Sequence, residues 1–431
     1  MKTKLAAALS ALCLLSGCAL SADTEALLRA PQLSGESRAL QKALNSYLNT
    51  AVTLKYPDSG DFLSPFAFGD WDGDGDDEAA VLYTADSTGT NVWLAVLEAD
   101  VDGEGWHVSQ TVEGLSGEVE VFSAAHLRDT VSQQLIAGYT SAQGDSYLVV
   151  YRYADGSLNT VISQSYTNMI LADFTGKGDT QDLVLALPVE SDFGGVALQL
   201  LTNVDGEFRS AQTLNLGEGI YTGCAALQAG RGIDKHTYLV MDAYSDSGSL
   251  VSDIITYDEE TGFLQSYHPP GVSSVFAGTR RYDTTLLSCD IDQNGTVDIP
   301  VEAEDGGVIV SPLDKRLRFV VWQDYAGEDG GKSTFGVYDA SNRIFYGLPP
   351  ALRKNVMLRP LANGSGWQVC SQQGTVTYCE LRMVEATAAD NEQYTRIANV
   401  GSQQLQVRVL TTYAGLTVEY IQKHTVLLGA E

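Results

Sequence analysis

The chain has 431 residues, of which 55 are acidic and 26 are Lys or Arg, so its formal net charge is −29. A negative field of this size repels phosphate backbones and attracts cations, which argues against nucleic acid as a partner. The same charge keeps a protein surface soluble, and we assign most of it to that role. No run of 18 uninterrupted apolar residues follows the first 17 residues, so the sequence predicts no membrane-spanning helix.

The N-terminal segment 1–17 has the features of an export signal. Two lysines precede an apolar run at residues 5–15 that is too short to cross a membrane as a stable helix. Residues 15–18 read Leu-Ser-Gly-Cys, which matches the lipobox of bacterial lipoproteins. This resemblance implies cleavage before Cys18 and a diacylglycerol on its sulfur, which would anchor the protein to the extracytoplasmic face of the cell membrane. An ordinary signal peptide is the alternative.

Residues 18–60 are predicted to form a polar, lipidated tether that ends in a short helix. Between Glu36 and Leu48, the apolar residues Leu40, Leu44 and Leu48 recur on one helical face. Beyond residue 60 the helical period nearly disappears, and short runs of Val, Leu, Ile and Tyr alternate with Asp-Gly and other Gly-rich turns. This second pattern predicts β-strands joined by tight turns.

The most informative pattern is a nine-residue acidic loop that occurs twice. Residues 70–78 read Asp-Trp-Asp-Gly-Asp-Gly-Asp-Asp-Glu, and residues 290–298 read Asp-Ile-Asp-Gln-Asn-Gly-Thr-Val-Asp. Oxygen-bearing side chains stand at positions 1, 3, 5 and 9, and the Gly at position 6 permits a tight bend. Such a loop can wrap a hard cation such as Ca²⁺; simple acidic turns are the alternative.

Aligning these loops with the apolar strand that follows gives five units. They begin at residues 68, 124, 171, 225 and 287, and their strands are predicted at residues 79–83, 134–138, 182–186, 238–241 and 298–301. A strand-turn-strand unit repeated at roughly 50 residues is typical of a propeller blade, because blades bury their faces against one another. The sequence therefore predicts a mainly β fold, with a β-propeller of about five to seven blades over residues 61–322. A β-sandwich, or a pair of them, is the alternative.

The units resemble FG-GAP repeats, also described as VCBS or FG-GAP-like repeats, which form the propeller blades of integrin α chains and of many bacterial surface proteins. The resemblance covers about residues 60–320 and includes the Phe-Gly pair at residues 68–69. In that family the loop binds Ca²⁺ within one blade, so the resemblance implies Ca²⁺ as a structural cofactor. The implied ligands are the side chains of Asp70, Asp72, Asp74 and Glu78 with the Asp76 carbonyl, and the side chains of Asp290, Asp292, Asn294 and Asp298 with the Thr296 carbonyl.

The other three units depart from this pattern. The third loop has Asp173, Thr175 and Lys177 at positions 1, 3 and 5. An ammonium group at position 5 would stand where the cation belongs. Lys177 is therefore predicted to replace the ion as an internal counter-charge that faces Asp173 and either Asp179 or Asp182. The second and fourth units keep the strands but lose the acids.

Residues 323–431 do not continue the repeat. A short helix that begins at a Pro is predicted within residues 347–354, and strand-like runs follow at residues 367–370, 375–384 and 404–411. This segment is interpreted as a small C-terminal α+β appendage, with a degenerate last blade as the alternative.

Four cysteines follow the lipid-carrying one. Outside the cell an even number of Cys permits two disulfides. Cys370 and Cys379 lie on either side of a predicted turn and could form a cross-strand bridge, whereas a bridge between Cys224 and Cys289 is the weaker expectation.

The sequence contains no recognisable motif of a catalytic centre, and its five His show no metal-ligand spacing. We therefore predict a protein that is not an enzyme. It would be a calcium-stabilised, lipid-anchored module on the bacterial cell surface that binds an unidentified protein or glycan. The alternative is a propeller-based carbohydrate-active enzyme, a polysaccharide lyase or hydrolase, which only analogy of fold supports.

Overall fold

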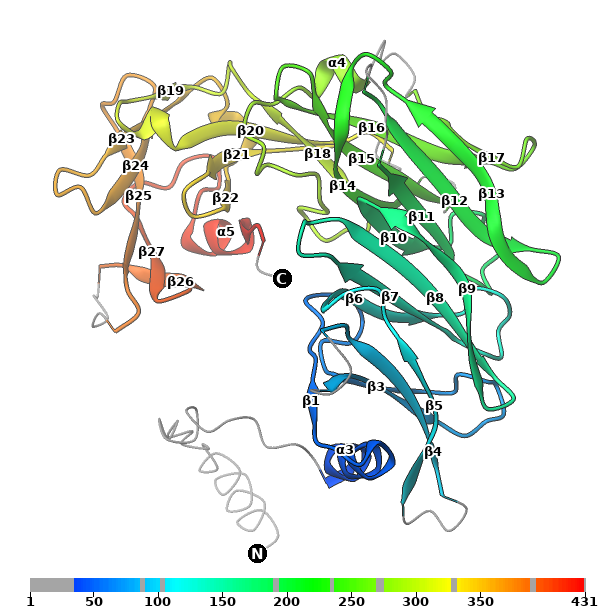
Figure 1. Ribbon diagram of the computed structural model, residues 1–431. Coiled ribbons are helices and arrows are strands. Elements are labelled where there is room, and N and C mark those ends of the chain that lie inside the picture. The colour runs from blue at the N-terminus through cyan, green and yellow to red at the C-terminus, as the bar shows by residue number, and fades with distance from the viewer. Residues whose placement is uncertain are drawn as a thin grey trace, which may run out of the picture.

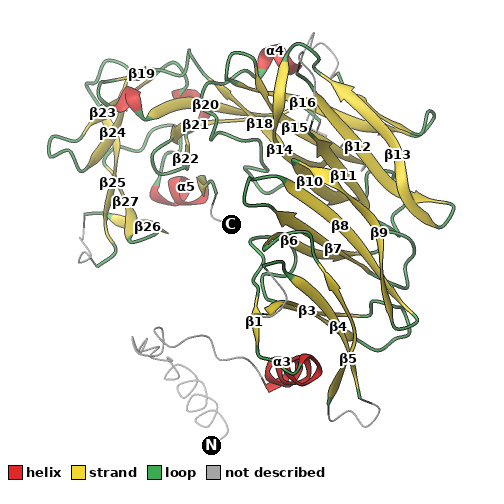
Figure 2. Cartoon of the chain, viewed as in Figure 1, coloured by secondary structure: helices red, strands yellow, loops and turns green. Residues whose placement is uncertain are grey.

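A computed structural model describes residues 35–85, 90–100, 105–188, 194–232, 236–268, 275–326, 332–387 and 393–429. Strands make up 53% and helices 8% of the structure, which confirms the expected mainly β class (Figure 2). The predicted signal at residues 1–17 and the lipid site at Cys18 lie outside the described residues. Within the described ranges, no helix is both long and apolar enough to span a bilayer.

The described chain begins with one helix and a five-stranded sheet, sheet A. The helix is α3 (Gly35–Leu48), which confirms the amphipathic segment expected there. Sheet A contains β1 (Val52–Leu54), β2 (Phe66–Gly69), β3 (Glu78–Ala85), β4 (Trp93–Ala99) and β5 (Trp106–Glu113). Its strand order is β1-β3-β4-β5, and β2 also pairs with β3, so that β1 and β2 share one edge of that strand.

The next three sheets each consist of four antiparallel strands in chain order. Sheet B contains β6 (Glu118–Ala125), β7 (Gln134–Thr140), β8 (Ser146–Ala154) and β9 (Ser157–Tyr166). Sheet C contains β10 (Asn168–Ala172), β11 (Asp182–Leu187), β12 (Val196–Val204) and β13 (Glu207–Leu216). Sheet D contains β14 (Tyr221–Arg231), β15 (Thr237–Ser245), β16 (Leu250–Asp258) and β17 (Phe263–Ser266), and the short α4 (Val275–Gly278) follows it.

The last two sheets interleave along the chain. Sheet E contains β18 (Asp298–Glu302), β20 (Leu317–Asp324), β21 (Ser333–Asp339), β22 (Ile344–Gly347) and β28 (Thr425–Leu427). Sheet F contains β19 (Val308–Ile309), β23 (Val356–Pro360), β24 (Gly366–Ser371), β25 (Thr377–Glu385), β26 (Thr395–Val400) and β27 (Gln403–Val409). The short helices are η1 (Leu313–Lys315), η2 (Pro350–Leu352) and α5 (Val418–Lys423).

Every strand expected to open a unit is present, as β3, β7, β11, β15 and β18. The expected boundary between residues 322 and 323, however, falls inside β20. Residues on both sides of it pair within sheet E, whose last strand, β28, comes from the end of the chain. The C-terminal segment therefore completes one sheet and builds another.

Hydrophobic clusters fill the space between consecutive sheets, from A and B through to E and F. Side chains alternate across a strand, so a strand buried on both faces can serve two clusters. In β3, Ala80 and Leu82 face sheet B, whereas Val81 and Tyr83 pack with α3. Figure 1 shows the sheets following one another in chain order along an arc.

The two ends of this arc differ in chemistry. Leu40 and Leu44 of α3 cover the outer face of sheet A. Sheet F instead carries hydrogen-bonded polar side chains on the face away from its core: Arg382 donates to Gln406 at 2.9 Å, and Gln368 donates to Glu380 at 2.9 Å. No hydrophobic cluster of the described residues joins sheet F to sheet A, and the sheets form no closed barrel. A closed ring of blades is thus not seen in the described part of the chain.

Candidate functional site

The first acidic loop connects β2 to β3 and is built around Asp70. Its two carboxylate oxygens accept the backbone N–H groups of Gly73 at 2.6 Å and Gly75 at 3.0 Å. Both glycines have positive φ, +85° and +98°, which favours Gly because it lacks a Cβ. Glu78 closes the loop, because its Oε2 accepts the N–H of Trp71 at 2.9 Å. The indole of Trp71 is fully buried and fixes the loop to the core between sheets A and B.

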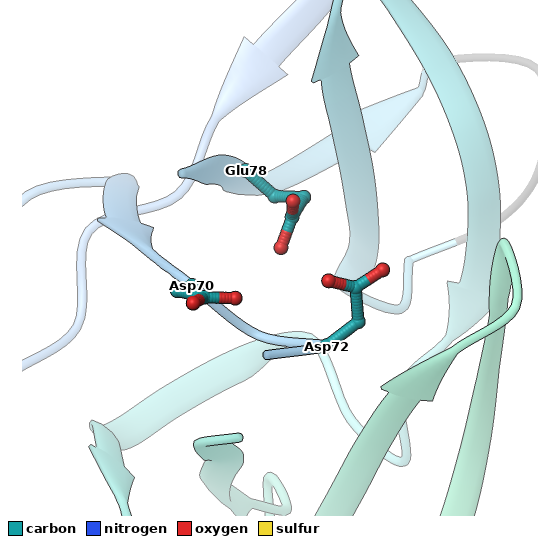
Figure 3. Close-up of side chains that lie close together, drawn as sticks. All are labelled: Asp70, Asp72 and Glu78. Atoms are coloured by element: carbon teal, nitrogen blue, oxygen red, sulfur yellow. The ribbon is translucent and has the colours of Figure 1, made fainter. Parts of the chain in front are cut away.

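This loop brings three acids together. One carboxylate oxygen each from Asp70, Asp72 and Glu78 lie within 4.8 Å of one another. Figure 3 shows the three side chains pointing toward a common space. Burial, followed by the charges of Asp72, Asp74 and Asp70, raises the pKa of Glu78 to about 7. Burial and the neighbouring Asp74 also raise the pKa of Asp72. The cluster therefore holds negative charges that a cation would stabilise.

The second acidic loop leads into β18 and repeats this construction. Asp290 accepts the N–H groups of Asn294 at 3.0 Å and Gly295 at 2.7 Å. Asp298 is 4% exposed and accepts the N–H of Ile291 at 3.2 Å. Ile291 is buried beside sheet E, as Trp71 is buried in the first loop.

Asp290, Asp292 and Asp298 form the second cluster, again with one oxygen from each within 4.8 Å of the others. Burial raises the pKa of Asp298 to about 7, and the charges of Asp292, Asp324 and Asp290 add to the shift. Both clusters can hold a metal ion, because each directs three carboxylates toward one point.

The side chains at the fifth position of both acidic loops accept a backbone hydrogen bond from the seventh position. Asp74 Oδ1 accepts the N–H of Asp76 at 2.9 Å, and Asn294 Oδ1 accepts the N–H of Thr296 at 2.7 Å. These are side-chain turns that shape the loop. The three-acid clusters contain six of the ten predicted positions, and the Asp74 carboxylate is not part of the first cluster. Ligation by the Asp76 carbonyl, the Asn294 side chain and the Thr296 carbonyl stays a prediction.

Two further charged groups beside the second cluster could not be found from the loop motif. Asp324, in β20, accepts a hydrogen bond from Thr296 Oγ1 at 3.3 Å. Lys332 Nζ lies 3.7 Å from Asp292 Oδ2. Both residues are distant in sequence from the loop. Asp324 reaches it because β18 pairs with β20, and Lys332 reaches it because its carbonyl accepts the N–H of Asp324, so local spacing carried no signal for them.

Four loops share one hydrogen bond that the motif did not reveal. In each, the first residue of the following strand accepts a backbone N–H from near the start of the loop. The acceptors are Glu78, Gln134, Asp182 and Asp298. Gln134 is fully buried and accepts the N–H groups of Leu127 at 2.9 Å and Arg128 at 3.2 Å. The second unit therefore keeps the loop frame with a neutral amide in place of an acid.

The loop of the third unit differs from the prediction that Lys177 pairs with the acids of its own loop. Asp173 does accept the N–H groups of Lys177 and Gly178, as Asp290 does in the second acidic loop. The ammonium of Lys177, however, donates to the Thr202 hydroxyl at 3.3 Å and to the Asn203 carbonyl of β12. The expected pairing with Asp173 is therefore wrong: the side chain reaches across to the neighbouring strand and leaves the loop centre.

The structure holds all four described cysteines as free thiols. Cys370 and Cys379 do lie on paired strands, β24 and β25, but a register shift places Cys370 opposite Thr377 and Cys379 opposite Val369. Cys379 packs into the core between sheets E and F, whereas the Cys370 thiol contacts Gln368 and Thr377 on the polar face. The shift thus turns the two thiols to opposite faces, and the expected bridge is not formed.

No family model and no curated protein matches the chain. Among solved structures, a "putative 6-phosphogluconolactonase" from Bacteroides uniformis has 10% identity and a TM-score of 0.29, over 74% of this chain and 81% of that one. A hypothetical protein from Leishmania major has 11% identity and a TM-score of 0.24, over 70% and 94%. A rhamnogalacturonan lyase from Bacillus licheniformis has 12% identity and a TM-score of 0.23, over 56% and 59%. Similarities at this level carry no argument about fold or function.

Proposed function

We propose that both three-acid clusters bind Ca²⁺ and that the ion stabilises the fold. The observation that supports this is the repetition: two loops far apart in the chain each gather three carboxylates, and in both the Gly at position 6 donates its N–H to the first Asp. Ca²⁺ takes six to eight oxygen ligands and tolerates irregular geometry, which suits carboxylates and carbonyls from a short loop. Asp70, Asp72 and Glu78 would hold one ion, and Asp290, Asp292 and Asp298 the other.

We further propose that the sheets are FG-GAP-like propeller blades in an open array. Sheets B, C and D each have four antiparallel strands in chain order, which is the blade arrangement. The acidic loops lead directly into β3 and β18, and the corresponding loops of sheets B and C lead directly into β7 and β11. The covering of sheet A by α3 supports an array that ends there, because end units of a repeat need a cap.

At the level of the cell, we propose a lipoprotein anchored through Cys18 on the outer side of the membrane, where it binds a protein or a glycan. The lipobox supports the anchor, and millimolar Ca²⁺ outside the cell would suit loops that bind at about 10⁻⁴ to 10⁻³ M. The proposed role is binding rather than catalysis.

Two experiments test this proposal. Melting curves of the soluble domain in EDTA, Ca²⁺ and Mg²⁺ should show a lower midpoint in EDTA that Ca²⁺ restores far better than Mg²⁺. Identical curves in all three conditions would contradict structural calcium. Separately, Cys18→Ala should accumulate as an unprocessed precursor without lipid, whereas normal processing and membrane fractionation of that variant would contradict the lipoprotein assignment.

A further inference from the structure

A small cavity lies where sheets E and F meet, away from both acidic loops. Its volume is about 180 Å³, and its lining includes Arg316, Asp339, Asn342, Tyr346 and Trp367. Arg316 directly precedes β20, and Asp339 ends β21. Binding sites for drug-sized molecules usually measure about 300–1,000 Å³, so this cavity suits a single small ring or the terminal unit of a larger ligand.

Arg316 indicates that the ligand of this cavity is an anion. Its Nε is buried and has no hydrogen-bond partner, and within the described ranges its guanidinium forms no ion pair. Buried donors are almost always paired, because leaving one unpaired costs free energy. In a chain with net charge −29, a guanidinium that forms no ion pair, even with Asp339 in the same cavity lining, indicates an anion that comes from outside the chain.

Asp339 narrows the class of anion. It is 1% exposed, and its oxygens accept hydrogen bonds from the Ser341 N–H at 3.1 Å and the Asn342 side-chain amide at 2.9 Å. Arg382 also lines the cavity, but its guanidinium donates to Gln406 and lies over the Tyr394 ring. The fixed negative charge of Asp339 disfavours sulfate or phosphate dianions, because like charges repel at close range. It favours a singly charged ligand with hydroxyl groups that can donate to the carboxylate.

Two aromatic side chains complete the lining. Tyr346 and Trp367 are each 2% exposed, and their rings meet edge to face with centroids 5.3 Å apart. Tyr346 lines the cavity, and its hydroxyl can donate or accept a hydrogen bond there. An apolar wall beside charged and hydroxyl groups suits a ring that has C–H bonds as well as hydroxyls.

We propose that this cavity binds a monocarboxylated sugar, a hexuronic acid unit. Arg316 would receive the carboxylate, while Asp339 and Tyr346 would hydrogen-bond to ring hydroxyls. The biological meaning of the site rests on the glycan-binding role proposed above. Its physical basis is separate from the calcium loops.

The test is calorimetric titration of the calcium-loaded soluble domain with galacturonic and glucuronic acid. One of the two should bind at a 1:1 ratio, whereas galactose, glucose and sulfate should bind at least about tenfold more weakly. Titration with oligogalacturonate and oligoglucuronate shows whether the natural ligand is a free acid or a polysaccharide. Equal affinity for monomer and oligomer indicates the free acid. Tighter binding of an oligomer indicates the end of a polysaccharide chain. Uronates that bind no better than neutral sugars overturn the proposal.

Variants assign the site within the molecule. Arg316→Gln should weaken uronate binding by at least about tenfold, and Arg316→Lys, which keeps the charge but loses the planar fork, by severalfold. Arg353→Gln is the matched control, because Arg353 pairs with Asp305 on the surface and should bind as wild type. Uronate affinity unchanged in a folded Arg316 variant overturns the assignment. If the wild-type domain is stabilised by Ca²⁺ but does not bind uronates, the uronate site is refuted and the calcium proposal is unaffected.

Discussion

The loops of the first and third units, which begin at Asp70 and Asp173, have the same backbone hydrogen-bond frame but different side chains at their centres. In both, an Asp at the start accepts N–H groups from the loop, and a buried acid at the end accepts another N–H. The first loop then adds Asp72 and gathers three carboxylates. In the third, Asp182 is surrounded by hydroxyls instead, because Thr175 and Thr202 both donate to it. The backbone frame thus does not need a cation, and the density of carboxylates decides whether a loop can hold one.

The largest expected effect comes from a unit with no acidic loop at all. Sheet D is tied to the following segment by Arg281, whose Nη2 lies 2.8 Å from Asp242 Oδ1, and both side chains are fully buried. Arg281 also donates to the Ser252 hydroxyl at 2.9 Å and lies beside Thr279. Arg281→Met should lower the free energy of unfolding by about 3–5 kcal/mol, because it leaves a buried carboxylate unpaired.

Denaturant unfolding with and without Ca²⁺ checks this value. The loss should be the same in both conditions, since this ion pair is complete without a metal. Arg280→Met is the neighbouring control on the protein surface and should change stability by less than about 0.5 kcal/mol. A loss of less than about 1 kcal/mol in Arg281→Met would show that the pair does not hold the two units together.

The second-largest loss of stability is expected from a substitution of Gln134, which holds the neutral loop of the second unit. Gln134→Met removes the acceptor for the buried N–H groups of Leu127 and Arg128 while keeping the side-chain volume. Unfolding free energy should fall by about 1–3 kcal/mol, again independently of Ca²⁺. Gln143→Met, at an exposed turn, is the control. If both variants melt alike, the shared loop frame carries little stability.

Substitutions in the acidic loops should lower stability only when Ca²⁺ is present. Asp72→Asn keeps the side-chain oxygen that accepts the Asp74 N–H but removes a ligand charge, and Asp292→Asn removes a ligand charge from the second cluster. At ten times Kd, each wild-type site should add about 1.4 kcal/mol of stability, so each variant should lose about that much. In EDTA neither variant should be less stable than wild type, because the substitution relieves repulsion between carboxylates. Variants that lose as much stability in EDTA as in Ca²⁺ would point to a purely structural role for these acids.

The smallest effect is expected at the third loop. Lys177 is exposed, and its ammonium bonds to Thr202 and the Asn203 carbonyl rather than to the loop acids. Lys177→Met should therefore lower stability by less than about 1 kcal/mol, with or without Ca²⁺. Chemical denaturation can resolve this value against Lys315→Met, another exposed Lys. A larger loss would restore the idea of an internal counter-charge.

Local features of the fold were predictable from the sequence, because short-range physics determines them. The helical spacing of Leu40 and Leu44 indicated α3, and apolar runs after turns indicated the strands β3, β7, β11, β15 and β18. The acid spacing likewise placed Asp70, Asp72 and Glu78 together.

Features that depend on pairing between distant strands were not predictable. The return of β28 to sheet E follows from the contact of Phe345 with Val426, which no local pattern encodes. The register shift that separates Cys370 from Cys379 depends on how β24 and β25 align. Lys177 turns toward β12 because Thr202 and the Asn203 carbonyl lie within reach, and its place in the loop motif gave no indication of this.

The stoichiometry of calcium binding tests the central claim most directly. Calorimetric titration of the EDTA-treated, dialysed soluble domain should reveal two sites with Kd values of about 10⁻⁴ to 10⁻³ M. Asp72→Asn or Asp292→Asn alone should leave one site, and the double variant should leave none. Two sites that persist in the double variant, or no calcium binding by the wild-type domain, would contradict the assignment of the two acidic clusters as calcium sites.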